Sequence, residues 1–315
     1  MNTPSYTTSI PLTRRSFLAS AAVSVTGLAL GESGLMAADT RSPCPVTVFS
    51  KVYQELKLDF AAAAEITAEA GLDGVDCPVR PGGEVEPEHA ADQLPRYSET
   101  LERLNLKIWL LTTGILSPAT PFTESILRTA KMLGINCYRL DFIKREPAEP
   151  EKQMREIRAH LKDLAALNRE LGLCALLENH SPVGKTVYFG GDLSEMAAAV
   201  ESFDPAEIGI AFDIGHALVV HGAEWRTHFE RLRPHFKIAY VKDVKRGAGW
   251  VRFGDGEIGS SGYFELLRSI GYHAPVSMHI EYDWSDHGTH KSRADLLQVL
   301  KDNSKVLRGW LAGVR

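Results

Sequence analysis

The sequence predicts an α/β protein built as a single (β/α)₈ TIM barrel. Eight short apolar, β-branched runs alternate with helix-length amphipathic segments along the chain, which is the pattern of strands joined by crossover helices. Eight such units within about 270 residues match this barrel in both count and length. An open, doubly wound sheet is the alternative. It lacks its usual fingerprint, because no G-x-G-x-x-G follows the first apolar run.

The predicted strands are the short apolar runs of each unit. In chain order they are residues 46–49, 74–77, 107–112, 135–141, 174–178, 208–213, 238–243 and 276–281. Several of them follow a Gly or Asn that suits the left-handed position just past a helix. These residues are Gly71, Asn105, Gly134, Gly172 and Gly271. Each one predicts a helix that ends and a strand that follows.

The segment 150–171 is the clearest predicted helix. Its apolar residues recur at steps of three and four, as on one face of an α-helix. They are Met154, Ile157, Leu161, Leu164, Leu167 and Leu171. We expect the stripe that they form to pack on the sheet.

The first residues predict an export signal. The stretch "TRRSFL" opens a short apolar run, from about Phe17 to Leu30, that ends among small residues near Ala37. This run is too short and too rich in Ala, Ser and Gly to span a bilayer stably, although an uncleaved anchor is the alternative. We therefore expect residues 1–38 to be a twin-arginine signal, residues 39–315 to form the barrel, and the protein to be exported to the periplasm with no stable membrane span.

Composition narrows the classes of partner. The formal net charge is -5 and no long basic run occurs, so the chain lacks the electrostatic footprint of a nucleic-acid-binding protein. The composition is compatible with a small polar substrate and with oligomerisation. The four cysteines show no C-x-x-C spacing, which favours buried thiols over a disulfide framework.

Three carboxylates stand out at the ends of predicted strands. Glu178, Asp213 and Glu281 end the runs "LCALLE", "IGIAFD" and "VSMHIE". In this barrel the C-terminal ends of the strands meet at one mouth, where converging carboxylates would repel one another and take up protons. A divalent cation removes that repulsion. Oxygen-rich coordination with at most one imidazole favours Mn²⁺, Mg²⁺ or Co²⁺ over a structural Zn²⁺ site.

Other strands also end in polar groups. They are Ser50, Lys51, Asp76, Thr112, Thr113, Arg139, Asp141, Asn179, His180, His216, Lys242 and Asp243. Any barrel rim is polar because it meets water, so each of these residues taken alone is as consistent with a solvated rim as with a site. Their number favours a polar small-molecule site at the mouth.

Five short motifs follow one another in the second half of the chain. They are "LLENH" around Glu178, D-x-x-H from Asp213 to His216, "VKD" with Lys242, "GDGEI" from Gly254, and "HIEYD" around Glu281. In order and spacing this set resembles the xylose isomerase-like, sugar phosphate isomerase/epimerase superfamily, which includes ketose 3-epimerases and inosose dehydratase. The resemblance covers nearly all of the chain after residue 38.

The resemblance implies roles for individual residues. It implies that Glu178, Asp213 and Glu281 bind the metal and that the two Glu residues form the acid/base pair. It implies that His216 and Arg246 contact the substrate; together with Arg246, the rim residues His180 and Lys242 are candidates for orienting sugar hydroxyls or a carboxylate.

One position departs from the family pattern. Tyr240 stands where relatives have a metal-binding histidine, and a neutral phenol is a poor ligand. Either three carboxylates and water hold the metal, or the metal binds more weakly, or His180 or His216 completes the shell.

The predicted function is a metal-dependent isomerase or epimerase that acts on a sugar or keto-sugar by proton transfer through an enediolate. Elimination by a lyase or dehydratase on a keto-sugar or glycoside is one alternative, and a non-catalytic sugar-binding barrel is another. The endonuclease IV branch of the superfamily carries a histidine-rich zinc site. Only His180, His216 and His279 fall near the predicted mouth, and the chain is acidic, which disfavours that reading.

Overall fold

The structure, a computed structural model, describes residues 44–285 and 291–314. The predicted export signal at residues 1–38 lies outside the described residues. Within the described part of the chain, no helix is both long enough and apolar enough to cross a membrane.

Eight parallel strands close into one barrel, as predicted. Their order around the barrel is β1-β10-β7-β6-β5-β4-β3-β2, with every neighbouring pair parallel. The strands are β1 (Val46–Phe49), β2 (Gly74–Val79), β3 (Lys107–Thr113), β4 (Cys137–Arg139), β5 (Cys174–Glu178), β6 (Ile208–Asp213), β7 (Phe236–Val241) and β10 (Val276–Met278). A short antiparallel hairpin, β8 (Val244–Lys245) with β9 (Gly249–Trp250), follows β7.

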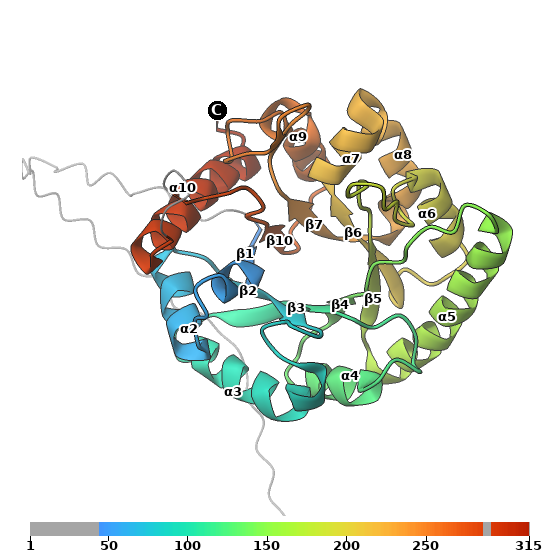
Figure 1. The fold of residues 1–315 in the computed structure, drawn as a ribbon, viewed down its shortest axis with the longest axis horizontal. Helices are drawn as coiled ribbons and strands as arrows, with labels where there is room; N and C mark the ends of the chain where they lie inside the picture. Colours follow the sequence, from blue (N-terminus) through green and yellow to red (C-terminus); the bar gives the residue numbers. More distant parts are fainter. Residues whose placement is uncertain (1–43, 286–290, 315) are drawn as a thin grey trace, which may run out of the picture. The chain divides into compact units, whose positions relative to one another are not determined.

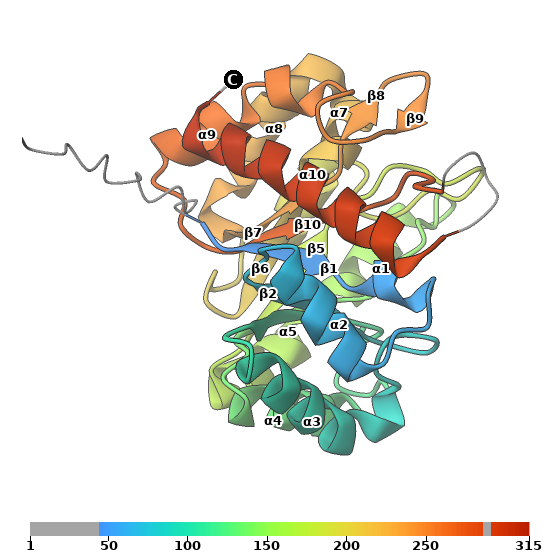
Figure 2. The same ribbon diagram turned by 90° about the vertical axis from the view of Figure 1, so that its left-hand side faces the viewer.

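Helices surround the barrel (Figure 1). The α-helices are α1 (Lys51–Gln54), α2 (Phe60–Glu69), α3 (Ala90–Glu102), α4 (Thr123–Met132), α5 (Pro150–Leu171), α6 (Leu193–Val200), α7 (Ile214–His221), α8 (Trp225–Leu232), α9 (Tyr263–Ser269) and α10 (Arg293–Ala312). Four short 3₁₀ turns, Pro87–His89, Gly222–Glu224, Arg233–His235 and Ile258–Ser260, complete the described elements. Figure 2 shows α10 and α2 side by side on the outer side of the barrel.

The helix predicted at 150–171 has the same bounds in the structure. Pro150 opens it, where a missing N–H costs nothing, and Gly172 closes it with φ +70°. Asn105 has φ +58°, which confirms that it fills the same left-handed position after α3. Local stereochemistry therefore accounts for where these helices stop.

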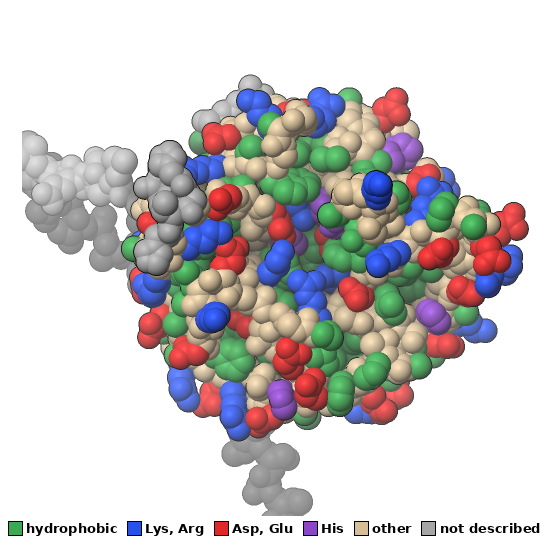
Figure 3. Space-filling model, in the orientation of Figure 1, with side chains coloured by type: hydrophobic (Ala, Val, Ile, Leu, Met, Phe, Trp, Pro, Cys, Tyr) green, Lys and Arg blue, Asp and Glu red, His purple; other side chains and the backbone are tan. Residues whose placement is uncertain are grey.

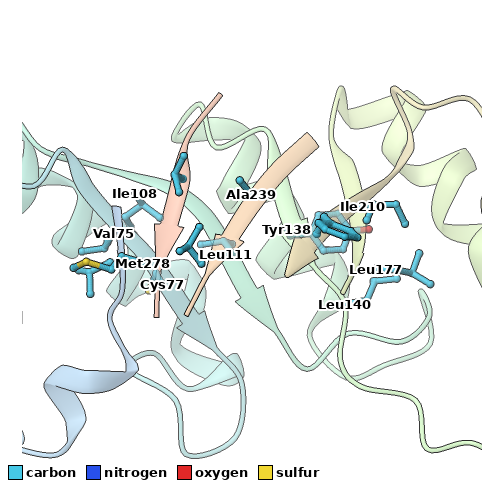
Figure 4. Close-up of a cluster of buried hydrophobic side chains, with 14 of the residues drawn as sticks. Val75, Cys77, Ile108, Leu111, Tyr138, Leu140, Leu177, Ile210, Ala239 and Met278 are labelled. Atoms are coloured by element: carbon cyan, nitrogen blue, oxygen red, sulfur yellow. The ribbon is translucent and has the colours of Figure 1, made fainter. Parts of the chain in front are cut away.

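Side chains alternate between the two faces of the barrel wall. A small cluster inside the barrel consists of Leu110, Cys174, Leu176, Ala211, Ile238 and Tyr240. Neighbours such as Leu111, Leu177 and Ile210 belong to the larger cluster between strands and helices, part of which Figure 4 shows. The four cysteines are free thiols, three of them buried and Cys137 partly exposed, as the lack of paired spacing predicts.

Five strand ends differ from the prediction. β3 ends at Thr113 rather than at residue 112, β4 at Arg139 rather than at 141, and β7 at Val241 rather than at 243; the ends of β2 and β10 matter most for the site. β10 ends at Met278 rather than at residue 281, because its neighbour β7 ends at Val241 and only His279 N continues the ladder, donating to Val241 O at 2.9 Å. β2 runs to Val79, two residues beyond its predicted end, so Arg80 comes directly after it.

Candidate active site

A cavity of about 420 Å³ opens where the strands end, among the loops that follow them. Its size falls within the range of about 300–1,000 Å³ that is typical of small-molecule sites. Glu178, Lys242 and Glu281, which end or follow β5, β7 and β10, all line it. Figure 3 shows Lys and Arg side chains gathered near the centre of this face, over the barrel.

Glu178 is the last residue of β5 and is buried. Its Oε2 lies 3.3 Å from Nε of Arg139, the last residue of β4. Burial raises the pKa of Glu178, although the positive charges of Arg139 and Lys242 oppose that rise. Glu178 is therefore a carboxylate held at the cavity wall with an increased tendency to take up a proton.

Asp213 ends β6 and begins α7, and it is fully buried. Its Oδ1 accepts the His216 N–H at 2.9 Å, as an N-cap residue does. The side chain of Asn179 makes two hydrogen bonds of 2.8 Å with the backbone of Asp213: Nδ2 donates to the Asp213 carbonyl, and Oδ1 accepts the Asp213 N–H. Oδ2 of Asp213 makes no hydrogen bond and lies 3.2 Å from Lys242 Nζ. Burial raises the pKa of Asp213 to about 6.

Lys242 lies at the centre of the polar groups. It follows β7 and is buried, with Nζ 3.2 Å from Asp213 Oδ2 and 3.0 Å from His216 Nε2. Burial opposes its charge, but the carboxylates of Asp213, Glu178 and Glu281 outweigh burial and raise the pKa of Lys242. The side chain is therefore an ammonium group.

The contacts of Lys242 settle the tautomer of His216. Burial, with Lys242 next, lowers the pKa of His216 well below its ordinary value, so the ring is neutral. Because an ammonium only donates, Nε2 of His216 is the acceptor and Nδ1 carries the proton. The Nδ1–H then donates to Ser181 Oγ at 2.8 Å.

Three of these groups are arranged as ligands of a cation would be. One ligand atom each from Glu178, Asp213 and His216 lies within 4.8 Å of the other two. Asp213 Oδ2 is a buried oxygen without a hydrogen bond. Two carboxylate oxygens and one imidazole nitrogen suit a divalent cation such as Mn²⁺, Mg²⁺ or Co²⁺. The residues fit such an ion, with the ammonium of Lys242 as its competitor for Asp213 and His216.

Of the other predicted site residues, Glu281 and His180 line the cavity and Arg246 does not. Glu281 lines the cavity but lies outside the group of three, and its Oε2 is 3.4 Å from Lys51 Nζ. His180 lines the cavity with its ring 3.8 Å from the His216 ring. Arg246 does not line it, because its exposed side chain pairs with Glu257 at 2.7 Å.

Tyr240 does not line the cavity, although it pairs in register with Asp213 across β6 and β7. Its side chain is buried in the barrel. The hydroxyl oxygen lies 3.4 Å from Thr112 Oγ1, and the centre of its ring lies 4.4 Å from the centre of the His279 ring. Asp76 accepts from Thr112 at 2.7 Å and from Ser277 at 2.9 Å in the same network. Burial raises the pKa of Tyr240, so the phenol stays neutral.

The "GDGEI" and "VKD" motifs have a structural role. Asp243 accepts backbone N–H groups of Val244, Gly254, Gly256 and Ile258 at 2.9 to 3.2 Å. A Cβ on Gly256 would stand 2.2 Å from Asp243 Oδ1, so only glycine fits there. Asp243 therefore holds the loop after β7.

Sequence reasoning missed several wall residues of the cavity, among them Arg80 and Phe142. Arg80 lines it because β2 is longer than predicted, and Phe142 lines it from the loop after β4. Trp250, in β9, also lines the cavity. The signal for Arg80 was its position one residue past a strand end, which depends on knowing where that strand stops.

Comparison with known proteins identifies the family. Residues 64–307 match the xylose isomerase-like TIM barrel family. The chain belongs to this family. No curated protein matches it.

Several solved structures share the fold. D-psicose 3-epimerase from Clostridium cellulolyticum H10 is 13% identical with a TM-score of 0.59, over 85% of this chain and 96% of that one. 3-Keto-D-glucoside 4-epimerase from E. coli is 13% identical with a TM-score of 0.58, over 81% and 98%. D-allulose 3-epimerase from a Methylomonas species is 12% identical with a TM-score of 0.62, over 85% and 97%.

Proposed function

We propose that this protein is a carbohydrate isomerase or epimerase that moves a proton at a carbon next to a carbonyl group. The observation that supports it best is the cavity wall, where the carboxyl group of Glu178 comes from the end of β5 and that of Glu281 from the segment after β10. The fold family supports the same class, because the matched structures include sugar epimerases.

Glu178 is the residue that we assign as the base. Its burial raises its pKa, which strengthens it as a proton acceptor, and such groups contribute about 10²- to 10⁴-fold to proton-transfer rates. The ion pair with Arg139 orients the carboxylate. Glu281, whose Oε2 lies 3.4 Å from Lys51 Nζ, is assigned as the acid, which in its protonated form supplies the proton that the carbon takes up.

The path of the returned proton distinguishes the reaction types. Return to the opposite face of the same carbon gives epimerisation, and delivery to the neighbouring carbon gives isomerisation. Loss of a leaving group next to the carbanion gives elimination, which is the chemistry of the lyase alternative.

Glu178, Asp213 and His216 are the residues that would hold a divalent cation, with Mn²⁺, Mg²⁺ or Co²⁺ favoured by the donor set. When bound, such a cation supplies electrophilic polarisation of the substrate carbonyl and stabilises the negative charge that develops. Lys242 lines the same space. Phe142 and Trp250 offer apolar faces on which a sugar ring can pack.

The test is exchange of solvent deuterium into ketohexoses such as D-fructose, D-tagatose and D-psicose, followed by NMR with the full-length protein. We expect exchange at the carbon next to the carbonyl, and a loss of at least about 100-fold in Glu178→Gln and in Glu281→Gln. Glu156→Gln, at an exposed position on α5, is the matched control and should exchange like the wild type.

Two results would contradict the proposal. Sugar binding without exchange would identify a binding barrel, and release of an unsaturated product would identify a lyase. Elemental analysis of the protein purified without added metal tests the cation independently of activity.

We propose in addition that the twin-arginine segment exports the folded protein. The support is the sequence "RRSFL" before a short apolar run. Fractionation of cells should find the protein in the periplasm and the Arg14→Lys, Arg15→Lys double variant in the cytoplasm; equal distribution of the two would refute export by this route.

A further inference from the structure

Arg80 differs from the other cationic residues of the cavity. The others are each paired with a carboxylate: Lys51 with Glu281 at 3.4 Å, Arg139 with Glu178 at 3.3 Å, and Lys242 with Asp213 at 3.2 Å. Within residues 44–285 and 291–314, the guanidinium of Arg80 has neither an ion pair nor a hydrogen bond. The cavity therefore carries one more positive charge than its paired carboxylates neutralise.

The acidic residues that follow in the chain near Arg80 make contacts of their own. Glu84 contacts Ser50 Oγ, and Glu86 accepts the Gly82 N–H at 2.9 Å. Asp141 is the carboxylate whose charge acts most strongly on Arg80. It accepts the Phe142 N–H at 2.8 Å and does not pair with the guanidinium. Within the described residues, Arg80 therefore has no carboxylate as an ion-pair partner.

The local backbone and the Phe49 ring determine the position of Arg80. It is half-buried directly after β2, with its guanidinium 5.6 Å from the centre of the Phe49 ring. Its own carbonyl accepts the Gly83 N–H at 2.7 Å, and a Cβ on Gly83 would come within 2.7 Å of that carbonyl. This tight turn holds Arg80 at the cavity wall.

The electrostatic surroundings leave the charge exposed to a ligand. Burial and the neighbouring charge of Arg139 lower the pKa of Arg80, yet a guanidinium stays protonated in proteins. A half-buried, unpaired charge is unfavourable until a partner arrives. A cation bound by Glu178, Asp213 and His216 would add further positive charge to the same space.

We propose that Arg80 binds an anionic group of the substrate, a carboxylate or a phosphate, and that the sugar on which this barrel acts is therefore acidic. This inference rests on the proposed function, since it names the substrate class of the same site. The planar guanidinium can bind two oxygens of such a group at once. The specificity for the acid is assigned to Arg80, while the proton transfer is assigned to Glu178 and Glu281.

The test compares matched acidic and neutral sugars by isothermal titration calorimetry with the full-length protein. The probes are glucuronate against glucose, galacturonate against galactose, and glucose 6-phosphate as the phosphate arm. We expect the wild type to bind at least one acid at least about 10-fold more tightly than its neutral partner, as one charge-assisted pair provides. The two arms tell a carboxylate from a phosphate.

The variants locate that preference. Arg80→Gln should lower the ratio of the two dissociation constants toward one, and Arg80→Lys should keep part of it because the charge remains without the planar fork. Lys162→Gln removes the same charge from an exposed position on α5 and should keep the full ratio. This comparison separates a contact from a general loss of positive charge.

Three outcomes would overturn the inference: neutral sugars bound as tightly as the acids, a ratio that Arg80→Gln leaves unchanged, or no binding of any acid. Deuterium exchange distinguishes these from failure of the proposed function. If neutral ketohexoses exchange with the wild type and no acid binds more tightly than its neutral partner, the isomerase or epimerase assignment stands while the acidic substrate is refuted.

Discussion

The ammonium of Lys242 lies 3.2 Å from Asp213 Oδ2, the one oxygen of that carboxylate without a hydrogen bond. The positive charge of Lys242 therefore lies next to Asp213 and also contacts His216, two of the three residues that could bind a metal ion. The same carboxylate cannot serve both partners fully, so the two cations should compete.

Replacement of Lys242 by methionine tests that competition. We expect Lys242→Met to bind Mn²⁺ at least about 10-fold more tightly than the wild type in calorimetry, because it removes the competing charge. Lys245→Met, at an exposed position of β8, is the control and should bind like the wild type. Equal affinity in all three proteins would show that Lys242 does not occupy the space of the metal.

The same variant makes a prediction about stability. Without metal, Lys242→Met should lose about 3–5 kcal/mol of unfolding free energy, because it leaves the buried Asp213 without its partner. Added Mn²⁺ should restore much of that loss in thermal unfolding. An unaltered melting temperature in chelator would contradict the buried ion pair.

Asp76 should make stability depend on pH. Burial raises its pKa from 3.8 to about 6, so the folded state holds a proton that the unfolded chain releases. This contribution is fully present below about pH 4 and is lost as the pH rises through about 6, with a size of about 3 kcal/mol.

Asp76→Asn should remove this part of the pH dependence. An amide retains the acceptor for Thr112, whose hydroxyl donates to Asp76 at 2.7 Å, and it does not ionise. As the pH rises from 4 to 7, the wild type should lose unfolding free energy in urea unfolding, and the variant should lose less. The stability of the variant relative to the wild type should therefore increase over this range. Parallel curves for the two proteins over this range would refute the raised pKa.

The sequence predicted the barrel because its signals are local. Apolar runs and left-handed residues such as Gly172 mark strands and helix ends without knowledge of tertiary contacts. Glu178 and Asp213 could be placed at the mouth for the same reason, since each closes an uninterrupted apolar run.

The remaining site residues depend on distances between separate segments. Glu281 points to Lys51 because β10 stops at Met278 and the chain leaves the ladder. Arg246 lies in the β8–β9 connection, where Glu257 binds it. The contact between Lys242 and His216 depends on how closely the first turn of α7 approaches the end of β7, which no local pattern encodes.

Tyr240 offers a test of the missing family ligand. It pairs in register with Asp213 across β6 and β7, and both are buried. Tyr240→His should raise Mn²⁺ affinity by at least about 10-fold, because a neutral imidazole is a metal ligand and a neutral phenol is a poor one. Tyr240→Phe, the control, should not raise it. Equal effects of the two changes would show that the position does not reach the ion.

Gly215 provides the space in which Lys242 lies. A Cβ there would stand 2.6 Å from the Lys242 carbonyl oxygen, 2.9 Å from its Cγ and 3.1 Å from the Trp250 ring. Because backbone must move to relieve this overlap, Gly215→Ala should lower the unfolding free energy by about 1–3 kcal/mol and weaken Mn²⁺ and sugar binding.

A second glycine in a helix gives the matched control for Gly215. A Cβ on Gly309 in α10 would meet only the Val314 carbonyl oxygen, at 3.5 Å, so Gly309→Ala should raise the unfolding free energy by about 0.5–1 kcal/mol through lower unfolded-state entropy. Urea unfolding measures both changes and calorimetry with Mn²⁺ measures the site. Opposite signs are expected for the two alanines; if Gly215→Ala stabilised the protein as Gly309→Ala does, the close contact of α7 with Lys242 would be refuted.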